Sequence, residues 1–502
     1  MKKLLSLALA MIMVLATLSA VFTINGFATD DEEDEGVITP DTSWYNESAT
    51  EYEIADAADF LGFAVLLNGT KNEAGDAYDV EPVTFKGKTV KLTANIDVNP
   101  GWNANEYFTN LTDEGEGSDM TFAIDPANKW PINNNGPIFQ GTLDGQNHYV
   151  SGIFAPFNQA HDVALFGSAG AETDVTVTIK NVAFLNSYVG LGGCRVGGFI
   201  ANGAGPVVFE NVYNAMCIYA WRTDQKDIAG GFMGYASYSG TGDITVKDCV
   251  FAGSILAATD GMCISAFVGG INAANQELKY EDCLNIGTLK GGTAQGSFTI
   301  KNKGITKLDT CVVNGTFDKD VGYLVARDLR GGEGVSYEGK SVLYVATECK
   351  GVFNKNASYA GAEPTATEVT VENLKNIGSW AVAQSIAGFS DWTATLEDGG
   401  IKMPITADLA AAVKAFSAPA VTPDENPGGD NNQENQTPAD DNDKKDDTTE
   451  APDTEAPETT KAAETTEAAE EKGCGGIIGA GAIAIVAVTG AALAIGAKKK
   501  ED

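Results

Sequence analysis

Ile179-Lys180-Asn181-Val182 returns four times along the chain with the same order of residue types. In each copy an apolar residue precedes a charged or acidic one, then Asn, Asp or Thr, then Val or Cys. The later copies are Phe209-Glu210-Asn211-Val212, Val246-Lys247-Asp248-Cys249, Tyr280-Glu281-Asp282-Cys283 and Leu308-Asp309-Thr310-Cys311. Counted from Val182, successive copies are 30, 37, 34 and 28 residues apart. A period of this length is typical of repeat proteins in which each unit forms one layer of a stack.

The residues around each copy predict three short strands per repeat. A second element follows the first, as in Asn186-Ser187-Tyr188 and Gly253-Ser254-Ile255, and a glycine-paired third element follows that, as in Gly197-Gly198-Phe199. No helical stretch separates them. One such unit cannot bury its own apolar face, so the units must stack. The pattern therefore predicts an all-β fold, a parallel β-helix (β-solenoid), and the alternative is a β-sandwich of short repeated strands.

A short helix is expected before the repeats. Asp56 can cap its N-terminus, Asn68-Gly69 can end it, and Phe60, Leu61, Ala64 and Val65 share one face. A solenoid needs its open end covered. We therefore predict an amphipathic N-terminal capping helix.

Several segments carry a resemblance to a known family. The run from Phe139 to Ile153, FQGTLDGQNHYVSGI, resembles the opening turn of bacterial cell-surface β-helix proteins with GLUG-type repeats. Ala164-Leu165-Phe166-Gly167 is similar to the GLFG element of that family, with Ala in place of the first Gly. Further similar segments are Tyr52–Asn68, Phe85–Asp97 and Trp392–Ile405, so the resemblance spans about residues 44–406. It implies a right-handed β-helix on a cell surface and no single activity.

Both ends of the chain predict export and attachment to a membrane. Lys2 and Lys3 precede the apolar run Leu4–Ile24, which is typical of a signal peptide cleaved near Ala28, or alternatively of an uncleaved anchor. The uncharged run Gly473–Ala497 is long enough to span a bilayer. Because lysines follow it directly, we expect a single-pass transmembrane helix with a cytoplasmic C-terminus. The predicted organisation is a signal peptide (1–28), an acidic segment (29–43), a β-helix domain (44–416), a stalk (417–472) and a basic-tailed transmembrane anchor (473–502).

The stalk and the net charge limit the class of partner. Residues 421–472 hold 17 Asp and Glu against 4 Lys and contain none of Leu, Ile, Phe, Trp, Tyr, Met or Cys. Such a segment buries too little apolar surface to fold, which predicts a disordered acidic stalk. The whole chain carries a net charge of −36. This charge argues against nucleic acid as a partner and leaves a surface glycan or an extracellular protein.

Few residues could carry out catalysis or bind a metal. His148 and His161 are the only histidines, and neither stands in a metal or catalytic-triad motif, so no cofactor and no metal are expected. For His148 we predict a structural hydrogen bond. Seven cysteines lie between the two apolar ends, and three of them, Cys249, Cys283 and Cys311, share one repeat position. We predict that these three stack inward as reduced thiols, with disulfides or a zinc site as alternatives.

Two segments supply candidate ligand contacts. The loop Trp221-Arg222-Thr223-Asp224-Gln225-Lys226-Asp227 places Trp221, Arg222, Asp224 and Asp227 together, where they could hold or activate a sugar. The insertion 99–135 carries Trp102 and Trp130 among other aromatic residues. Alternatively the loop is merely solvated, and the insertion merely covers the side of the solenoid.

The sequence therefore favours a membrane-anchored cell-surface scaffold for adhesion or for glycan or protein binding. The alternatives are a carbohydrate-active β-helix enzyme, either a polysaccharide lyase or a glycosidase, and a purely structural spacer. A glycosidase would need two acids about 5–10 Å apart in a groove.

Overall fold

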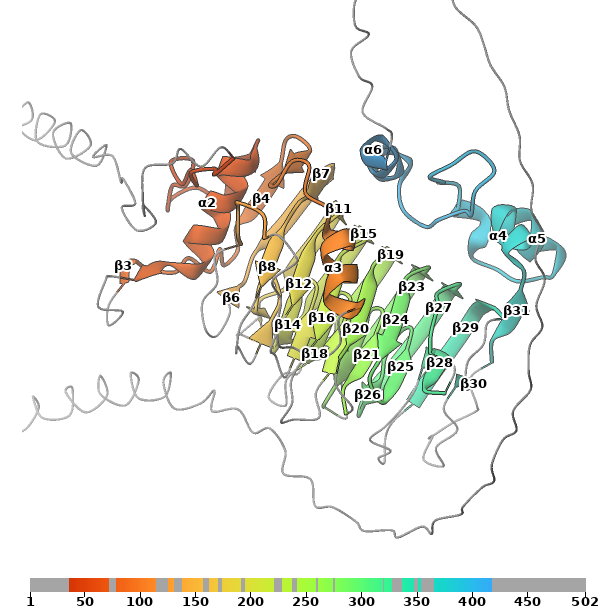
Figure 1. Cartoon of the computed structure of the whole chain (residues 1–502). Helices are drawn as coiled ribbons and strands as arrows, with labels where there is room; N and C mark the ends of the chain where they lie inside the picture. Colours follow the sequence, from red (N-terminus) through yellow and green to blue (C-terminus); the bar gives the residue numbers. More distant parts are fainter. Residues whose placement is uncertain are drawn as a thin grey trace, which may run out of the picture. The chain divides into compact units, whose positions relative to one another are not determined.

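The chain forms a parallel β-solenoid of about six turns with a few helices (Figure 1). The computed structural model describes residues 36–71, 78–113, 125–130, 138–156, 162–169, 174–190, 195–220, 228–236, 242–258, 261–273, 276–318, 320–326, 336–346, 351–353 and 365–417. The signal, stalk and anchor predictions and the 221–227 loop lie outside these residues. No helix within the described ranges is long and apolar enough to cross a bilayer.

Each complete turn contains four strands, not the three expected. One turn consists of β11 (Val177–Leu185), β12 (Tyr188–Gly190), β13 (Arg195–Gly197) and β14 (Ile200–Gly203). Every one of them pairs in parallel with its equivalents one turn away, which excludes the β-sandwich alternative. The third and fourth strands were read as one element because Gly197 and Gly198 form the corner between them. A Cβ on Gly197 would lie 2.0 Å from the Ile200 carbonyl oxygen, so only glycine fits there.

The strands form four parallel sheets that run along the solenoid, one strand per turn in each. We number the sheets in the order in which the chain passes through them within a turn. Sheet 1 consists of β1 (Glu51–Ile54), β4 (Thr89–Leu92), β7 (Thr142–Ser151), β11, β15 (Val207–Asn214), β19 (Ile244–Phe251), β23 (Glu277–Asn285), β27 (Ile305–Val313), β29 (Ser336–Val345) and β31 (Thr367–Val369), with β5 (Ile96–Asp97) also paired to β7. Sheet 2 consists of β8 (Phe154–Pro156), β12, β16 (Cys217–Ala220), β20 (Ser254–Ala257) and β24 (Thr288–Gly291).

The other two sheets are built from shorter strands. Sheet 3 consists of β9 (Asp162–Val163), β13, β17 (Ile228–Gly230), β21 (Cys263–Ser265), β25 (Ala294–Gly296), β28 (Gly322–Ala326) and β30 (Gly351–Phe353). Sheet 4 consists of β6 (Ile138–Phe139), β10 (Ser168–Ala169), β14, β18 (Met233–Ala236), β22 (Val268–Ile271) and β26 (Lys301–Asn302). Outside the stack, β2 (Thr70–Lys71) and β3 (Tyr78–Val80) form an antiparallel pair.

The recurring sequence motif marks a bend in the middle of each sheet 1 strand. Its third residue has a positive φ, 52° at Asn181, 53° at Asn211 and 52° at Asp248. Asn and Asp tolerate this left-handed conformation better than most residues. In a straight strand Ile179 and Val182 would face opposite sides, but the bend turns both into the core.

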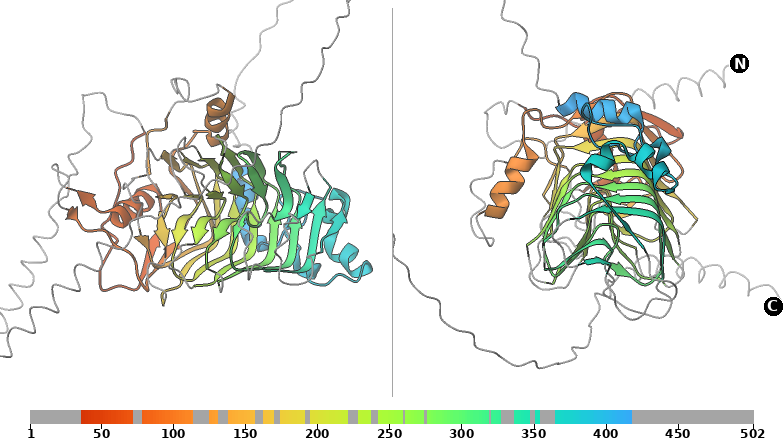
Figure 2. Two further views of the ribbon diagram at one scale, coloured as in Figure 1. Left: turned by 90° about the horizontal axis from the view of Figure 1, so that it is seen from below. Right: turned by 90° about the vertical axis from the view of Figure 1, so that its right-hand side faces the viewer.

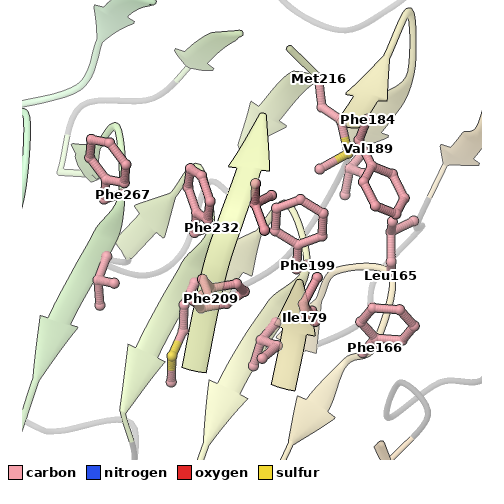
Figure 3. Close-up of a cluster of buried hydrophobic side chains, with 14 of the residues drawn as sticks. Leu165, Phe166, Ile179, Phe184, Val189, Phe199, Phe209, Met216, Phe232 and Phe267 are labelled. Carbon is pink, nitrogen blue, oxygen red and sulfur yellow. The ribbon is translucent and has the colours of Figure 1, made fainter. Parts of the chain in front are cut away.

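The core runs along the inside of the solenoid, where phenylalanines from successive turns stack (Figure 3). Ring centroids are 5.5 Å apart for Phe199 and Phe232, and 5.0 Å apart for Phe232 and Phe267. The three cysteines of the motif join this core in register, and Cys249, Cys283 and Cys311 are fully buried free thiols. This confirms the prediction of an inward, reduced stack. Cys194, Cys349 and Cys474 lie outside the described residues.

The predicted N-terminal helix is present as α2 (Ala57–Asn68). The Asp56 carboxylate accepts a hydrogen bond from the Asp59 amide at 3.0 Å, and Gly69 has a φ of 67°. The helix is not amphipathic, however. Residues on nearly all of its sides are buried, and a Cβ on Gly62 would lie 1.8 Å from the Asp41 carbonyl oxygen, so the preceding segment covers the face expected to meet solvent.

The last described segment consists mainly of helices and adds no further turn to the solenoid. After β31 the chain forms α4 (Val371–Lys375), α5 (Ile377–Ala383), a 3₁₀ turn η1 (Phe389–Asp391) and α6 (Ala407–Ser417). We call residues 370–417 the strap. Its apolar side chains pack on the outward-facing residues of sheet 1, and α6 contacts β7 and β11. The view along the solenoid shows α6 across one face and α3 (Ala104–Asp113) beside another (Figure 2).

Candidate functional site

The insertion that follows β5 is anchored to the solenoid by buried asparagines. The Asn99 amide nitrogen donates to the carbonyl oxygens of Asn128 and Gly152, at 2.8 and 2.7 Å. Asn128 in turn donates to Val98 at 2.9 Å and accepts from Ile38 at 2.7 Å. Because each side chain satisfies backbone groups of a different segment, these bonds fix the path of the insertion.

A third asparagine holds the start of α3, the helix within the insertion. Asn186 follows β11 and has a φ of 41°. Its amide nitrogen donates to the Trp102 carbonyl oxygen at 2.6 Å, and its side-chain oxygen accepts from the Ala104 amide at 2.8 Å. Asn186 therefore caps the N-terminus of α3 from the solenoid side and fixes the helix over sheet 2.

Aromatic side chains fill the contact between α3 and the outer face of sheet 2. The Trp102 ring lies 5.5 Å from that of Phe154, and the Tyr107 ring lies 5.0 Å from that of Tyr188, in edge-to-face arrangements. The cluster, here called the aromatic patch, consists of Trp102, Tyr107, Phe108, Phe154, Tyr188 and Tyr219. Tyr107, Phe154 and Tyr188 are buried in it, whereas Trp102, Phe108 and Tyr219 keep part of their rings at the surface.

Several polar atoms in and beside the aromatic patch are buried away from water. Burial raises the pKa of Tyr188 well above its usual value, and its hydroxyl has no hydrogen-bond partner among the residues that the structure describes. This hydroxyl lies over Gly190, whose missing side chain leaves room for it. The Tyr107 hydroxyl donates to Asp125 at 3.2 Å, and burial raises the pKa of the Cys217 thiol to about 12. A buried hydroxyl without a partner is a costly feature that natural structures keep rarely, often at functional positions.

The two predicted tryptophans of the insertion have different surroundings. Trp102 remains half-buried at the edge of the aromatic patch. Trp130 is 1% exposed, packs on Phe60 of α2, and donates its indole N–H to the Leu165 carbonyl oxygen at 3.2 Å. Its ring is enclosed by the core, so it offers no face to a ligand in this structure.

Trp221, Arg222, Asp224 and Asp227 lie outside the described residues, and the structure does not place them. The residues that the sequence interpretation omitted are Phe154, Tyr188 and Tyr219 of β8, β12 and β16. The sequence did contain a sign of them: three successive turns each carry a large aromatic ring at an outward-facing position of sheet 2, and such rings are usually covered by another part of the protein.

Three titratable groups outside the patch, His148, Asp248 and Asp282, have roles in holding the fold together. His148 Nδ1 lies 3.2 Å from Asn95 Oδ1, which confirms the predicted hydrogen bond. Asp248 and Asp282 occupy the bend position of neighbouring sheet 1 strands, where Asp282 accepts the Trp392 indole N–H of the strap at 2.9 Å. No group of three or more His, Cys, Asp or Glu within the described ranges is arranged to hold a metal ion.

Charges on the outer face of sheet 1 largely compensate one another. One row of stacked positions reads Lys180, Glu210, Lys247, Glu281, Asp309 and Lys340 along six successive strands. Lys340 lies 3.0 Å from Asp309, but such exposed pairs contribute only about 0–1 kcal/mol each. Alternation along most of the row avoids the repulsion that like charges would suffer across adjacent strands.

Comparisons with known proteins assign neither a family nor an activity. No protein-family model matches the chain, and no curated protein matches it. One solved structure, from Bacteroides ovatus and described as a putative immunoglobulin A1 protease, aligns with a TM-score of 0.39 at 14% identity, over 66% of this chain and 87% of that one. A similarity this low carries no argument about activity. The resemblance to GLUG-type proteins therefore remains one of sequence motifs.

Proposed function

We propose that this protein is a cell-surface binding scaffold whose solenoid presents the aromatic patch to a glycan. The proposal rests on one observation, the partial exposure of Trp102, Phe108 and Tyr219 in a single cluster that the insertion forms with sheet 2. Aromatic residues are enriched at surfaces where proteins bind their partners. The apolar C–H faces of sugar rings stack on such rings, and a neutral glycan does not oppose the acidic charge of the chain.

Display at the surface is part of the same proposal and is supported by the sequence. The run Leu4–Ile24 has the features of an export signal, and Gly473–Ala497 has those of a membrane anchor. The acidic segment between the solenoid and this second run would hold the patch away from the membrane.

A glycan array tests binding and turnover together. A chain covering residues 29–420 is applied to the array, and reducing ends and unsaturated products are measured in the same wells. We expect binding without product. Trp102→Ala and Phe108→Ala should each weaken binding about tenfold or more, which corresponds to ~1.4 kcal/mol.

The matched control is Trp380→Ala, which removes another half-buried indole, from α5 in the strap. This variant should bind like the parent chain. Equal losses in all three variants would point to general destabilisation and refute the proposed site. Product release would replace the scaffold with the carbohydrate-active alternative, and Arg222, Asp224 and Asp227 would then be substituted first.

A further inference from the structure

The strap crosses the turns of the solenoid in reverse order. Each of its contacts further along the chain falls on an earlier sheet 1 strand. Gly388 lies against Thr310 of β27, Trp392 binds Asp282 of β23, Thr406 binds Asn211 of β15, and the Phe416 ring lies 5.3 Å from that of Tyr149 of β7. The strap therefore leaves the solenoid at β31 and ends beside β7.

The C-terminal end of the strap, from Thr406 through α6, contacts sheet 1 through both hydrogen bonds and buried apolar side chains. The Thr406 amide donates to Asn211 Oδ1, and the Thr406 hydroxyl donates to Asn147 Oδ1, both at 2.9 Å. Leu409 and Val413 of α6 are buried against the outer face of sheet 1. Asn147 and Asn211 belong to β7 and β15, so one residue of the strap joins strands two turns apart.

Between its two ends the strap covers a continuous apolar row on the outside of the solenoid. This row consists of one residue from each of six stacked strands: Ala183, Tyr213, Val250, Leu284, Val312 and Leu343. Apolar residues at outward-facing positions are buried only because the strap lies on them.

Because α6 lies beside the first turns, a mechanical load can pass between the aromatic patch and the chain beyond Ser417 in two ways. The patch is built on β8, β12 and β16, in the same turns as β7, β11 and β15. While the strap is attached, a load passes from these turns directly into α6. Once the strap is released, the same load must pass through every later turn and leave at β31, where stacked strands can separate one after another.

We propose that the strap is a mechanical clasp that transmits tension between the C-terminal part of the chain and the turns carrying the patch. While closed, it keeps tension off the turns from β19 to β29. When it opens, it adds length before those turns are loaded. This inference rests on the proposed function, because surface tethering supplies the tension.

Force spectroscopy on the full-length chain in detergent, held by handles at its N- and C-termini, tests the clasp. We expect a first extension from the 48 residues between Thr370 and Ser417, about 170 Å at full stretch, followed by separate extensions from the solenoid turns. Leu409→Asp places a charge in the buried face of α6, so it should abolish the first extension and leave the separate extensions of the turns. Ala411→Asp, at an exposed position of the same helix, should behave like the parent chain.

A second, milder variant keeps the test conclusive if Leu409→Asp fails to fold. Thr406→Ala removes the hydroxyl and its hydrogen bonds to Asn147 and Asn211, and it keeps the backbone bond to Asn211 and the apolar face. It should keep the first extension but move it to lower force. Turns that open before or together with the strap in the parent chain would overturn the clasp, as would parent-like traces for both Leu409→Asp and Thr406→Ala. No glycan is present in this experiment, so its result is independent of whether the aromatic patch binds one.

Discussion

The residue at the bend of each sheet 1 strand must adopt a positive φ, and at some of these positions its side chain also makes a polar contact. Asn181, Asn211, Asp248, Asp282 and Thr310 all have φ between 52° and 56° there. Asn211 also donates from its side chain to Asn181 and Asn147, both at 3.0 Å. The recurrence of Asn and Asp in the sequence therefore reflects a left-handed residue whose side chain lies where the strap docks.

Two substitutions at Asn211 separate these roles. Asn211→Gly keeps the left-handed backbone accessible and removes only the side-chain hydrogen bonds, so it should cost about 1–2 kcal/mol. Asn211→Val adds a β-branched residue at positive φ and should cost about 1–2 kcal/mol more. Urea unfolding of both variants gives the two free energies. Equal losses would mean that the backbone conformation carries no penalty.

Asp248 makes stability depend on pH. Burial raises its pKa to about 6 from the ordinary aspartate value of 3.8, Lys247 opposes this rise, and the nearby Asp282, Glu210 and Glu281 carboxylates add to it. Because the folded pKa lies above the unfolded one, the folded state prefers the protonated form. Stability from this group is full below about pH 4 and falls as pH rises to about 6.

Asp248→Asn should therefore raise the free energy of unfolding at pH 8 and leave it nearly unchanged at pH 4. We expect a gain of about 1–2 kcal/mol, reduced from the full linkage value because the side chain is only half-buried. Denaturant unfolding at the two pH values checks this. A gain of equal size at both would assign the effect to something other than ionisation.

At the scale of elements, α3 depends on one residue outside it. Asn186→Ala removes both bonds that hold Trp102 and Ala104, so α3 should detach locally, at a cost of about 1–3 kcal/mol. Hydrogen exchange should accelerate at residues 104–113 while the strands of sheet 1 stay protected. Glycan binding should fall in parallel. Unchanged exchange in α3 would show that aromatic packing alone holds it.

The stacked strands could be predicted from sequence because their signal is local and repeated. The alternation of apolar residues and the bend residue recur along sheet 1, a glycine corner recurs in several turns, and stacking in register follows from them. The fourth strand was missed because Gly197 and Gly198 leave too little side-chain pattern to mark its start. The predicted bounds of α2 were right because capping is decided within four residues of each end.

The strap and the site could not be predicted in the same way. Thr406 binds Asn147, 259 residues earlier in the chain, and no local period reports such a contact. Trp102 and Trp130 look equivalent in sequence, yet residues on α2 and at Leu165 bury only the second. The aromatic patch combines an insertion with three separate turns, so its composition becomes apparent only after the turns are stacked.

At the scale of the whole molecule, the strap decides which surface meets solvent. Two apolar clusters lie on either side of sheet 1, the inner core and the layer beneath the strap. The outer layer includes Tyr213, Val250, Leu284 and Val312 in a row along successive strands. Uncovered, this row would form a long flat apolar stripe, a feature that promotes association.

A chain ending at Thr370 should therefore remain a solenoid but bind an apolar dye such as ANS and self-associate at micromolar concentration. A chain ending at Ser417 should do neither, because it keeps all of the strap that the structure describes. Light scattering measures association, dye fluorescence measures the exposed apolar surface, and circular dichroism checks that the strands persist in both. Loss of the β signal in the shorter chain would mean that the strap is required for the stack to fold. A monomeric, dye-free short chain would mean that the apolar row under the strap is not the surface inferred here, and would also weaken the argument that the strap carries load.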